Sequence, residues 1–294
     1  MYLAQVIARQ GKTFIVEDEQ GQQHQCHARS SAIDAVCGDR VECVATTDSK
    51  HVIEKIRERK NQITRIDNFK REKTLAANID HMIIVMAATP AFSTLLIDKY
   101  LACAQINQCK ATLVINKAEL LNSHDVDING LENTYKELVD HFIVASAKLG
   151  YGIQALRNVI ANEITILVGQ SGVGKSSLIN RLLRKNLIKV GELSKSIQQG
   201  KHTTTNAFAH NINQHGKIID SPGVRTFMPI FQNTQQVMRG YKEFLPHINH
   251  CKFSDCQHIN EPGCAIKAEV EKGNIMQTRY QSYLENIEEV KNQE

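Results

Sequence analysis

The sequence lacks several features that would exclude an ordinary globular fold. No apolar run approaches the ~20 residues that cross a bilayer, so we expect neither a transmembrane helix nor a membrane partner. The amino terminus, "MYLAQVIARQGKTF", has no basic segment followed by a long apolar core, so no secretory signal is predicted and a cytoplasmic protein is expected. Repeats and low-complexity segments are also missing. The net charge of +4 permits a polyanionic partner but does not require one.

The length and the apolar content predict several packed domains. A chain of 294 residues suggests two or three domains, and a hydrophobic fraction of 42% can supply their cores. The character of the sequence changes twice. We expect a small β-barrel over residues 1–68, an α/β domain over residues 69–230 and a helical, cysteine-containing domain over residues 231–294.

The first zone reads as short strands separated by turns. "KTFIVED" is rich in β-forming residues, and "GDRVECVAT" alternates. In the second run, Val41, Cys43 and Ala45 fall on one side of the strand, and Arg40 and Glu42 on the other. Closure into a barrel would leave few open edges.

A basic segment follows, from Lys55 to Lys73. Its cationic residues are Lys55, Arg57, Arg59, Lys60, Arg65, Lys70, Arg71 and Lys73. Such a run by itself is typical of a solvated linker. Beside a small barrel, it also indicates a nucleic-acid contact.

The second zone alternates strand and helix. "HMIIVMAA", "ATLVIN", "HFIVASA" and "ITILVG" are apolar runs typical of parallel strands buried on both faces. Between them, "TLLIDKYLACAQINQC", "GLENTYKELVD" and "IQALRNVIA" have helical spacing. This alternation predicts a doubly wound α/β sheet.

The strongest chemical motif is "GQSGVGKS", residues 169–176, which matches the pattern G-x-x-x-x-G-K-[ST]. It follows a predicted strand and precedes the helix "KSSLINRLLR", as a phosphate-binding loop requires. Its glycines let backbone N–H groups turn toward phosphate oxygens. Lys175 can reach the β- and γ-phosphates, and Ser176 can bind Mg²⁺. A chance glycine-rich turn is the alternative.

Two further segments fit the switch regions of such an enzyme. In "DSPG", Asp220 ends a predicted strand and can hold Mg²⁺ through water, while the N–H of Gly223 can meet the γ-phosphate. Upstream lies "KHTTT", in which one hydroxyl can complete the Mg²⁺ shell. The candidates are Thr203, Thr204 and Thr205, and the sequence does not choose among them.

The residue after Gly223 is Val224, where many GTPases carry a glutamine that orients the attacking water. Valine has no polar group, so slow hydrolysis by the chain alone is predicted. His202, beside the threonines, is the internal candidate for positioning water, and its alternative is a surface-loop histidine.

A base-reading loop comes earlier in the chain. In "NKAE", Asn116 would hydrogen-bond the guanine edge, the stem of Lys117 would cover the ring, and the carboxylate of Glu119 would take the N1 and N2 protons. Glu119 stands where an aspartate is usual. "SAK", residues 146–148, follows another predicted strand and has the form of a supporting base loop.

These motifs occur in the order base loop, base support, phosphate loop, switch one, switch two. A sheet requires only that its strand ends meet in space, so this order indicates a circular permutation. The residues expected to bind the nucleotide are Asn116, Lys117, Ala118, Glu119, Ser146, Ala147, Lys148, Gly169, Gln170, Ser171, Gly172, Val173, Gly174, Lys175, Ser176, Ser177, Asp220 and Gly223.

The last zone contains "CKFSDCQHINEPGC". Cys251, Cys256, His258 and Cys264 give the spacing C-x4-C-x-H-x5-C, which suits one closed tetrahedral Zn²⁺ with a structural role. Buried free thiols are the alternative.

Taken together, the chain resembles the ribosome small-subunit-dependent GTPase A family of circularly permuted GTPases. The segments that carry the resemblance are "NKAEL", "GQSGVGKSSLIN", "KHTTT", "DSPGVR" and "CKFSDCQHINEPGCAI". The resemblance implies an N-terminal OB-fold, a permuted P-loop GTPase core and a C-terminal zinc-binding helical domain. It also implies contact with the 30S subunit and its 16S rRNA, and GTP hydrolysis that is stimulated there. We expect a monomer that binds GTP and GDP, with His202 and Lys175 as the candidate catalytic residues.

Two other classes of function stay open from the sequence. A nucleic-acid-binding module that uses a nucleotide only as a stabilising ligand would show no GTP turnover. An ATP-dependent P-loop enzyme would prefer ATP in competition, although "NKAE" argues against it.

Overall fold

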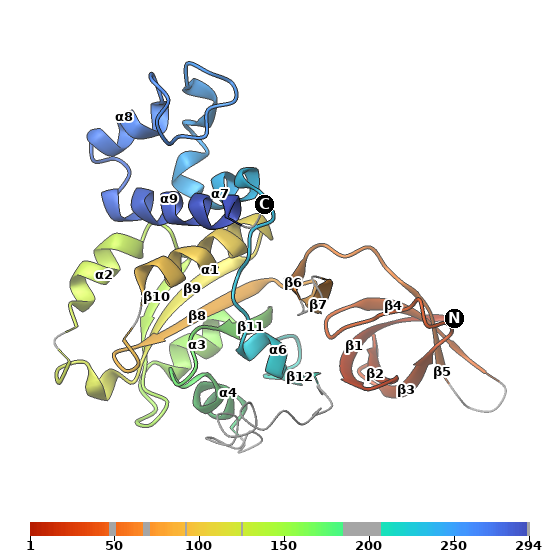
Figure 1. Cartoon of the computed structure of the whole chain (residues 1–294). Coiled ribbons are helices and arrows are strands. Elements are labelled where there is room, and N and C mark those ends of the chain that lie inside the picture. Colours follow the sequence, from red (N-terminus) through yellow and green to blue (C-terminus); the bar gives the residue numbers. More distant parts are fainter. Residues whose placement is uncertain (47–50, 67–70, 92, 125, 185–206, 293–294) are drawn as a thin grey trace.

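Three bodies follow one another along the chain in the computed structural model: a β-barrel, a central α/β layer and a helical C-terminal unit (Figure 1). The structure describes residues 1–46, 51–66, 71–91, 93–124, 126–184 and 207–292. Over these ranges, no helix has both the length and the apolar character needed to span a membrane.

Five strands near the N-terminus form the barrel. They are β1 (Tyr2–Gln10), β2 (Thr13–Asp18), β3 (Gln23–Ala28), β4 (Arg40–Ala45) and β5 (His51–Ile56). The strands pair in the order β1, β2, β3, β5, β4, and β4 pairs back onto β1, which closes the barrel. Phe14 and Ile53 lie in its core. The expected alternation in β4 is confirmed at the buried Val41 and Cys43, but Ala45 is exposed because it ends the strand.

The basic segment after the barrel contains a hairpin rather than a plain linker. Its strands are β6 (Gln62–Ile66) and β7 (Glu72–Ala77), which pair antiparallel. Just before β6, the guanidinium of Arg59 contacts both carboxylate oxygens of the fully buried Asp39, at 2.7 and 2.8 Å. This two-bond ion pair ties the start of the hairpin to the barrel.

The central sheet has the predicted α/β character. Its strands are β8 (His81–Ala87), β9 (Lys110–Asn116), β10 (His141–Val144), β11 (Ile164–Val168), β12 (Ala207–Asn211) and β13 (Lys217–Asp220). They lie in the order β10-β9-β8-β11-β13-β12, and the pairs up to β13 are parallel, while β12 is antiparallel. The sheet continues into the barrel, because Ala8 and Arg9 of β1 pair with Phe208 and Ala207 of β12.

Helices cover both faces of this sheet. One face carries α1 (Thr94–Ile106) and α2 (Ile128–Tyr135), and the other carries α3 (Ile153–Val159) and α4 (Lys175–Leu183). Every residue of β8 is buried, as expected for a central parallel strand between two helical layers. The carboxyl ends of the parallel strands therefore meet at one open edge, where ligands of such sheets bind.

The C-terminal unit is helical and packs on α1. It follows the short α6 (Pro222–Arg225) and contains α7 (Thr234–Gly240), α8 (Ala265–Glu271) and α9 (Gln277–Lys291), with single turns at Lys242–Phe244 and Ile248–His250. Figure 1 shows α9 lying across α1. Tyr241, Phe244 and Tyr283 are fully or nearly fully buried in the core of the unit.

A buried ion cluster fastens this unit to the α/β layer. Arg279 of α9 is 2% exposed, and its guanidinium lies 2.6 Å from a carboxylate oxygen of Asp98 on α1 and 2.7 Å from one of Glu243. The same guanidinium lies 4.5 Å from the ring centre of Tyr241. Removing one partner would leave an uncompensated buried charge, so the contact specifies how the helices dock.

Candidate nucleotide site and metal centre

The loop of residues 169–176 joins β11 to α4 at the open edge of the sheet. Gly169, Gly172 and Gly174 have φ values of 135°, 85° and 96°, which glycine tolerates and other residues rarely adopt. A Cβ on Gly169 would lie 2.1 Å from the carbonyl oxygen of Val85, and one on Gly174 would lie 2.3 Å from the side-chain nitrogen of Asn116. Glycine is therefore required at these two positions by close packing as well as by conformation.

Lys175 is the first residue of α4, and its side chain folds back over this loop. Its ammonium group donates hydrogen bonds to the carbonyl oxygens of Gly169, at 2.5 Å, and Gln170, at 2.7 Å. Burial lowers the pKa of Lys175 to about 8, and the positive charge of Arg225 contributes to the shift. An anion placed here would regain the lost charge stabilisation.

Asn116 ends β9 and connects the two motif regions that are separated in sequence. Its side chain is almost completely buried, donates to the carbonyl oxygen of Val173 at 2.8 Å, and accepts from the N–H of Ala147 at 3.1 Å. The phosphate loop and both predicted base loops are thus held together by one amide group.

The rest of the base loop is arranged by local hydrogen bonds. Lys117 adopts φ 60° and donates to the carbonyl oxygen of Thr89 at 2.6 Å. The hydroxyl of Ser146 donates to Glu119 at 2.5 Å and accepts from the N–H of Leu149 at 3.0 Å. The bond from Ser146 lowers the pKa of the Glu119 carboxyl, so an ionised acceptor is held at the mouth of the site.

A cavity of about 930 Å³ opens between these loops and the helices α3 and α4. Its lining includes the predicted residues Asn116, Lys117, Glu119, Ala147, Lys148, Gly174 and Ser177. It also includes residues that sequence reasoning missed, namely Gly150, Ile153, Arg157, Asn180, Arg181 and Arg184. Helical spacing from Ser177 was the available signal for the last three, because residues three, four and seven positions later share a face.

Arg181, which lines this cavity, holds the second base loop in place. Its guanidinium donates to the carbonyl oxygens of Ala147 at 2.7 Å and Lys148 at 2.9 Å. Arg157 of α3 in turn donates to the carbonyl oxygens of Arg181 and Leu182 at the end of α4, at 2.7 and 2.8 Å. The helix after the phosphate loop therefore supports the second base loop directly.

The "DSPG" segment lies at the neighbouring strand end. Asp220 ends β13, and the hydroxyl of Ser221 caps α6 by accepting from the N–H of Val224 at 3.1 Å. The Asp220 carboxylate is paired with the guanidinium of Arg225 through both oxygens. Val224 is 1% exposed and belongs to the apolar core, so its side chain is turned away from any water at the site. The predicted His202, Thr203, Thr204 and Thr205 lie outside the described residues.

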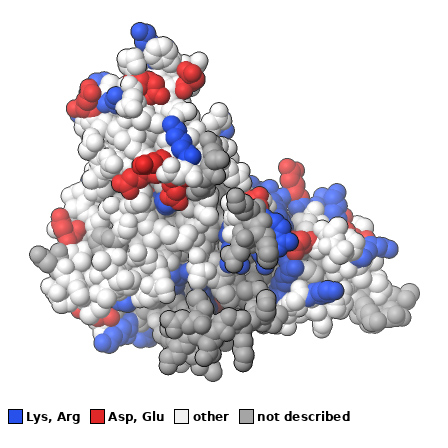
Figure 2. All heavy atoms as spheres, viewed as in Figure 1, with Lys and Arg blue, Asp and Glu red and all other residues white. Residues whose placement is uncertain are grey.

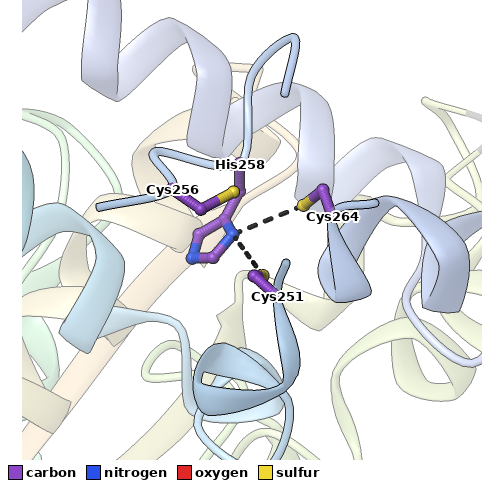
Figure 3. Close-up of side chains that lie close together, drawn as sticks. All are labelled: Cys251, Cys256, His258 and Cys264. Carbon is purple, nitrogen blue, oxygen red and sulfur yellow. Dashed lines mark hydrogen bonds between the residues drawn. The ribbon is translucent and has the colours of Figure 1, made fainter. Parts of the chain in front are cut away.

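The four predicted metal ligands come together in the C-terminal unit. The candidate ligand atoms of Cys251, Cys256, His258 and Cys264 all lie within 4.8 Å of one another (Figure 3). The Nδ1 atom of His258 lies 3.4 Å from the sulfur of Cys251 and 3.4 Å from that of Cys264. Soft sulfur donors and one imidazole at this spacing fit a small tetrahedral cation, so the cluster can hold a metal ion.

Surrounding groups fix the geometry of this cluster. The N–H of Ala265 lies 3.3 Å from the Cys251 sulfur, toward which it donates. On α9, the hydroxyl of Tyr280 donates to the carbonyl oxygen of His258 and that of Tyr283 donates to Gln257, both at 2.7 Å. Such outer contacts orient metal ligands before an ion binds.

Comparison of sequence and structure shows that this chain is similar to known proteins. Residues 56–229 match the family model of the RsgA GTPase. The protein named small ribosomal subunit biogenesis GTPase RsgA from Haemophilus influenzae (strain PittGG) is 38% identical over 286 residues, covering 95% of this chain and 83% of the relative. The protein of the same name from Chromohalobacter salexigens is 39% identical over 285 residues, covering 96% and 84%.

Two solved structures share the whole architecture. The crystal structure of YjeQ from Thermotoga maritima has a TM-score of 0.80 at 31% identity, covering 98% of each chain. YloQ, described as a circularly permuted GTPase, has a TM-score of 0.75 at 23% identity, covering 100% of this chain and 96% of its own, and supports the fold alone.

Proposed function

This chain belongs to the RsgA GTPase family, and from that premise we propose that it hydrolyses GTP to GDP and phosphate during late maturation of the small ribosomal subunit. The observation that carries the proposal is the position of Asn116. It lies 53 residues before Gly169 in sequence, yet its amide joins the phosphate loop to both base loops. The base-reading and phosphate-binding halves of one GTP site therefore meet despite their reversed order.

We assign the groups of the site as follows. The ionised Glu119 takes the guanine N1 and N2 protons, and Lys117 covers the ring. The loop of residues 169–176 and Lys175 hold the phosphates. Ser176 and one of the threonines at 203–205 supply oxygen ligands, which Mg²⁺ prefers, and Asp220 holds the ion through a water molecule. When bound, Mg²⁺ neutralises charge that develops on the phosphate oxygens. ATP lacks the guanine donor pair and would leave Glu119 unpaired.

The missing water-positioning group points to activation by a partner. Val224 faces the apolar core, so its side chain offers nothing to an attacking water. We propose that this group comes from His202, from the ribosomal subunit, or from both together. Partner-supplied groups in this chemistry are worth ~10³–10⁵ in rate.

The barrel and the hairpin after it are the proposed docking surface for 16S rRNA on the 30S subunit. Figure 2 shows Lys and Arg side chains gathered where the barrel meets the central layer. Residues 1–68, 69–230 and 231–294 would then serve as the rRNA-binding barrel, the GTPase core and a zinc-stabilised helical domain. We further propose that the protein works as a cytoplasmic monomer.

The experiment that tests this function measures GTP hydrolysis with and without purified 30S subunits, over a series of salt concentrations. Strong stimulation that weakens as salt rises is expected, because phosphate contacts release counterions. A rate without subunits equal to the rate with them would contradict partner activation. His202→Ala should reduce the stimulated rate while GTP affinity stays unchanged. In a binding competition, GTP should be preferred over ATP, whereas an ATP-dependent enzyme would prefer ATP.

A further inference from the structure

The carboxylate assigned to Mg²⁺ already has a cationic partner within the chain. The Nε atom of Arg225 donates to Asp220 at 2.5 Å, and a second guanidinium nitrogen contacts the other carboxylate oxygen. The side chains of Arg225 and Asp220 are 13% and 9% exposed. A two-bond pair of this kind, largely shielded from water, is among the stronger ion pairs in proteins.

We propose that Arg225 is the internal counter-ion of Asp220, which it holds when no magnesium–nucleotide is bound and releases when magnesium–GTP binds. The inference rests on the proposed function, since it takes Asp220 as the carboxylate that faces the magnesium ion through water. Arg225 acts through Asp220 and is therefore a positioning residue.

The positive charges of the site explain why the pair must open. Arg225 lies close enough to Lys175 to help lower the pKa of that ammonium group. A divalent cation bound beside Ser176 and Asp220 would bring a second cationic centre to the carboxylate that Arg225 already contacts. Like charges at close range are unfavourable, so Arg225 cannot keep both of its bonds to Asp220 when the cation is present.

The position of Arg225 couples this exchange to other parts of the molecule. Arg225 is the last residue of α6, and Gly223 in the same helix packs so closely on β7 that a Cβ there would lie 2.8 Å from Leu75. Two residues after Arg225, the carbonyl oxygen of Phe227 accepts a 2.6 Å hydrogen bond from Tyr100 of α1. Movement of α6 would therefore shift its contacts with the hairpin and with α1, on which the C-terminal unit packs.

The test compares magnesium dependence of nucleotide affinity in the full-length native chain and in Arg225→Gln. GDP and GTP dissociation constants are measured by calorimetry in EDTA and at increasing free Mg²⁺. The variant should need about tenfold less Mg²⁺ for half of the affinity gain, because the cation no longer displaces a charged hydrogen-bonding partner. In EDTA, its GTP affinity should fall, because the Asp220 charge is then uncompensated beside the phosphates.

Two further variants separate this role from a structural one. Arg225→Lys keeps the charge but cannot form two parallel hydrogen bonds to one carboxylate. The free Mg²⁺ concentration at half of the affinity gain, the magnesium midpoint, should therefore lie between those of the native chain and Arg225→Gln. Arg29→Gln removes a guanidinium paired with Glu54 in the barrel and should leave the midpoint unchanged. A midpoint in Arg225→Gln equal to or higher than the native value would overturn the proposal.

A second readout does not depend on affinity. The chain contains no tryptophan, so Thr226→Trp, at an exposed position beside Arg225, gives emission from that site alone. Its emission should change with GTP and Mg²⁺ together but not with GTP in EDTA. Identical spectra in both conditions would contradict release of Arg225.

The affinity results separate this inference from the proposed function. If the native chain shows no magnesium-dependent GTP binding, the proposed function fails as well. If native binding is normal and the midpoint is unchanged in Arg225→Gln, only this inference fails.

Discussion

The metal centre and the nucleotide site are built in opposite ways. The four residues of the metal centre lie within fourteen consecutive positions, and short loops bring them together. The nucleotide site draws on segments from Asn116 to Gly223, more than one hundred residues apart, and a sheet brings them together. We expect a bound ion to add stability to the short segment that holds the cluster, whereas the nucleotide site is built on the two apolar cores of the sheet.

The largest expected effect comes from breaking the metal centre. Cys256→Ser should release the ion and loosen residues 251–264, because structural zinc contributes about 10–16 kcal/mol of folding free energy in small domains. GDP affinity should stay close to native, since the sheet and both of its helical layers lie outside the centre. Metal analysis, hydrogen exchange and calorimetry check the three parts of this prediction.

His250→Ala is the matched control for that change. His250 lies next to Cys251 but is not among the clustered ligands, so its removal should leave the metal content unchanged. Full metal content in Cys256→Ser would show that Cys256 is not a ligand. Native protein purified without chelator that contains no metal would show that the cluster is a set of free thiols.

The second prediction tests how the base loop selects guanine. Glu119→Ala should weaken GDP binding by about 10- to 100-fold, because a hydrogen bond to a charged group is worth about 1.5–3 kcal/mol. ADP binding should stay weak and unchanged. Glu119→Asp, which keeps the charge and shortens the reach, should retain most of the discrimination. Equal affinities of the native chain for GDP and ADP would contradict the assignment.

The third prediction concerns pH. A lysine whose pKa is lowered to about 8 is largely neutral in the free protein above that pH, while bound phosphates favour its charged form. GTP affinity should therefore be full below pH 8 and fall as the pH rises above it. Binding should take up about one proton at pH 9 and almost none at pH 7.

Calorimetry in two buffers of different ionisation enthalpy measures that proton uptake. The exposed Lys272→Met is the control and should keep the native uptake. Uptake that is absent at pH 9 in the native chain would show that Lys175 does not change its charge on binding.

The smallest expected effect is at the support of the second base loop. Arg181→Ala removes two hydrogen bonds to the carbonyl oxygens of Ala147 and Lys148 and should weaken GDP binding about fivefold, the equivalent of about 1 kcal/mol. Arg181→Lys can replace only one bond and should be intermediate. The loss should be equal for GDP and GTP, because the γ-phosphate lies at the other end of the site.

Local signals determined a large part of this protein from the sequence. β8, β9 and β11 are predictable because strands buried on both faces are continuous apolar runs. The loop of residues 169–176 is predictable because its glycines and lysine are consecutive, and the metal ligands because their spacing is short. Even the permutation follows from the order of motifs along the chain, since the two base loops and the phosphate loop each follow the end of one strand and "DSPG" begins at the end of another.

Only the tertiary structure decided the contacts between distant segments. Asn116 bonds Val173, Arg225 pairs with Asp220, and Arg279 is buried against Asp98 and Glu243. The hairpin of β6 and β7 and the pairing of β1 with β12 were also hidden. Periodicity along a chain indicates whether a side chain faces a core, but it does not indicate which residue of a distant segment that side chain contacts. That partner is decided when the layers pack, because a buried charge or amide is stabilised only by the groups that packing brings beside it.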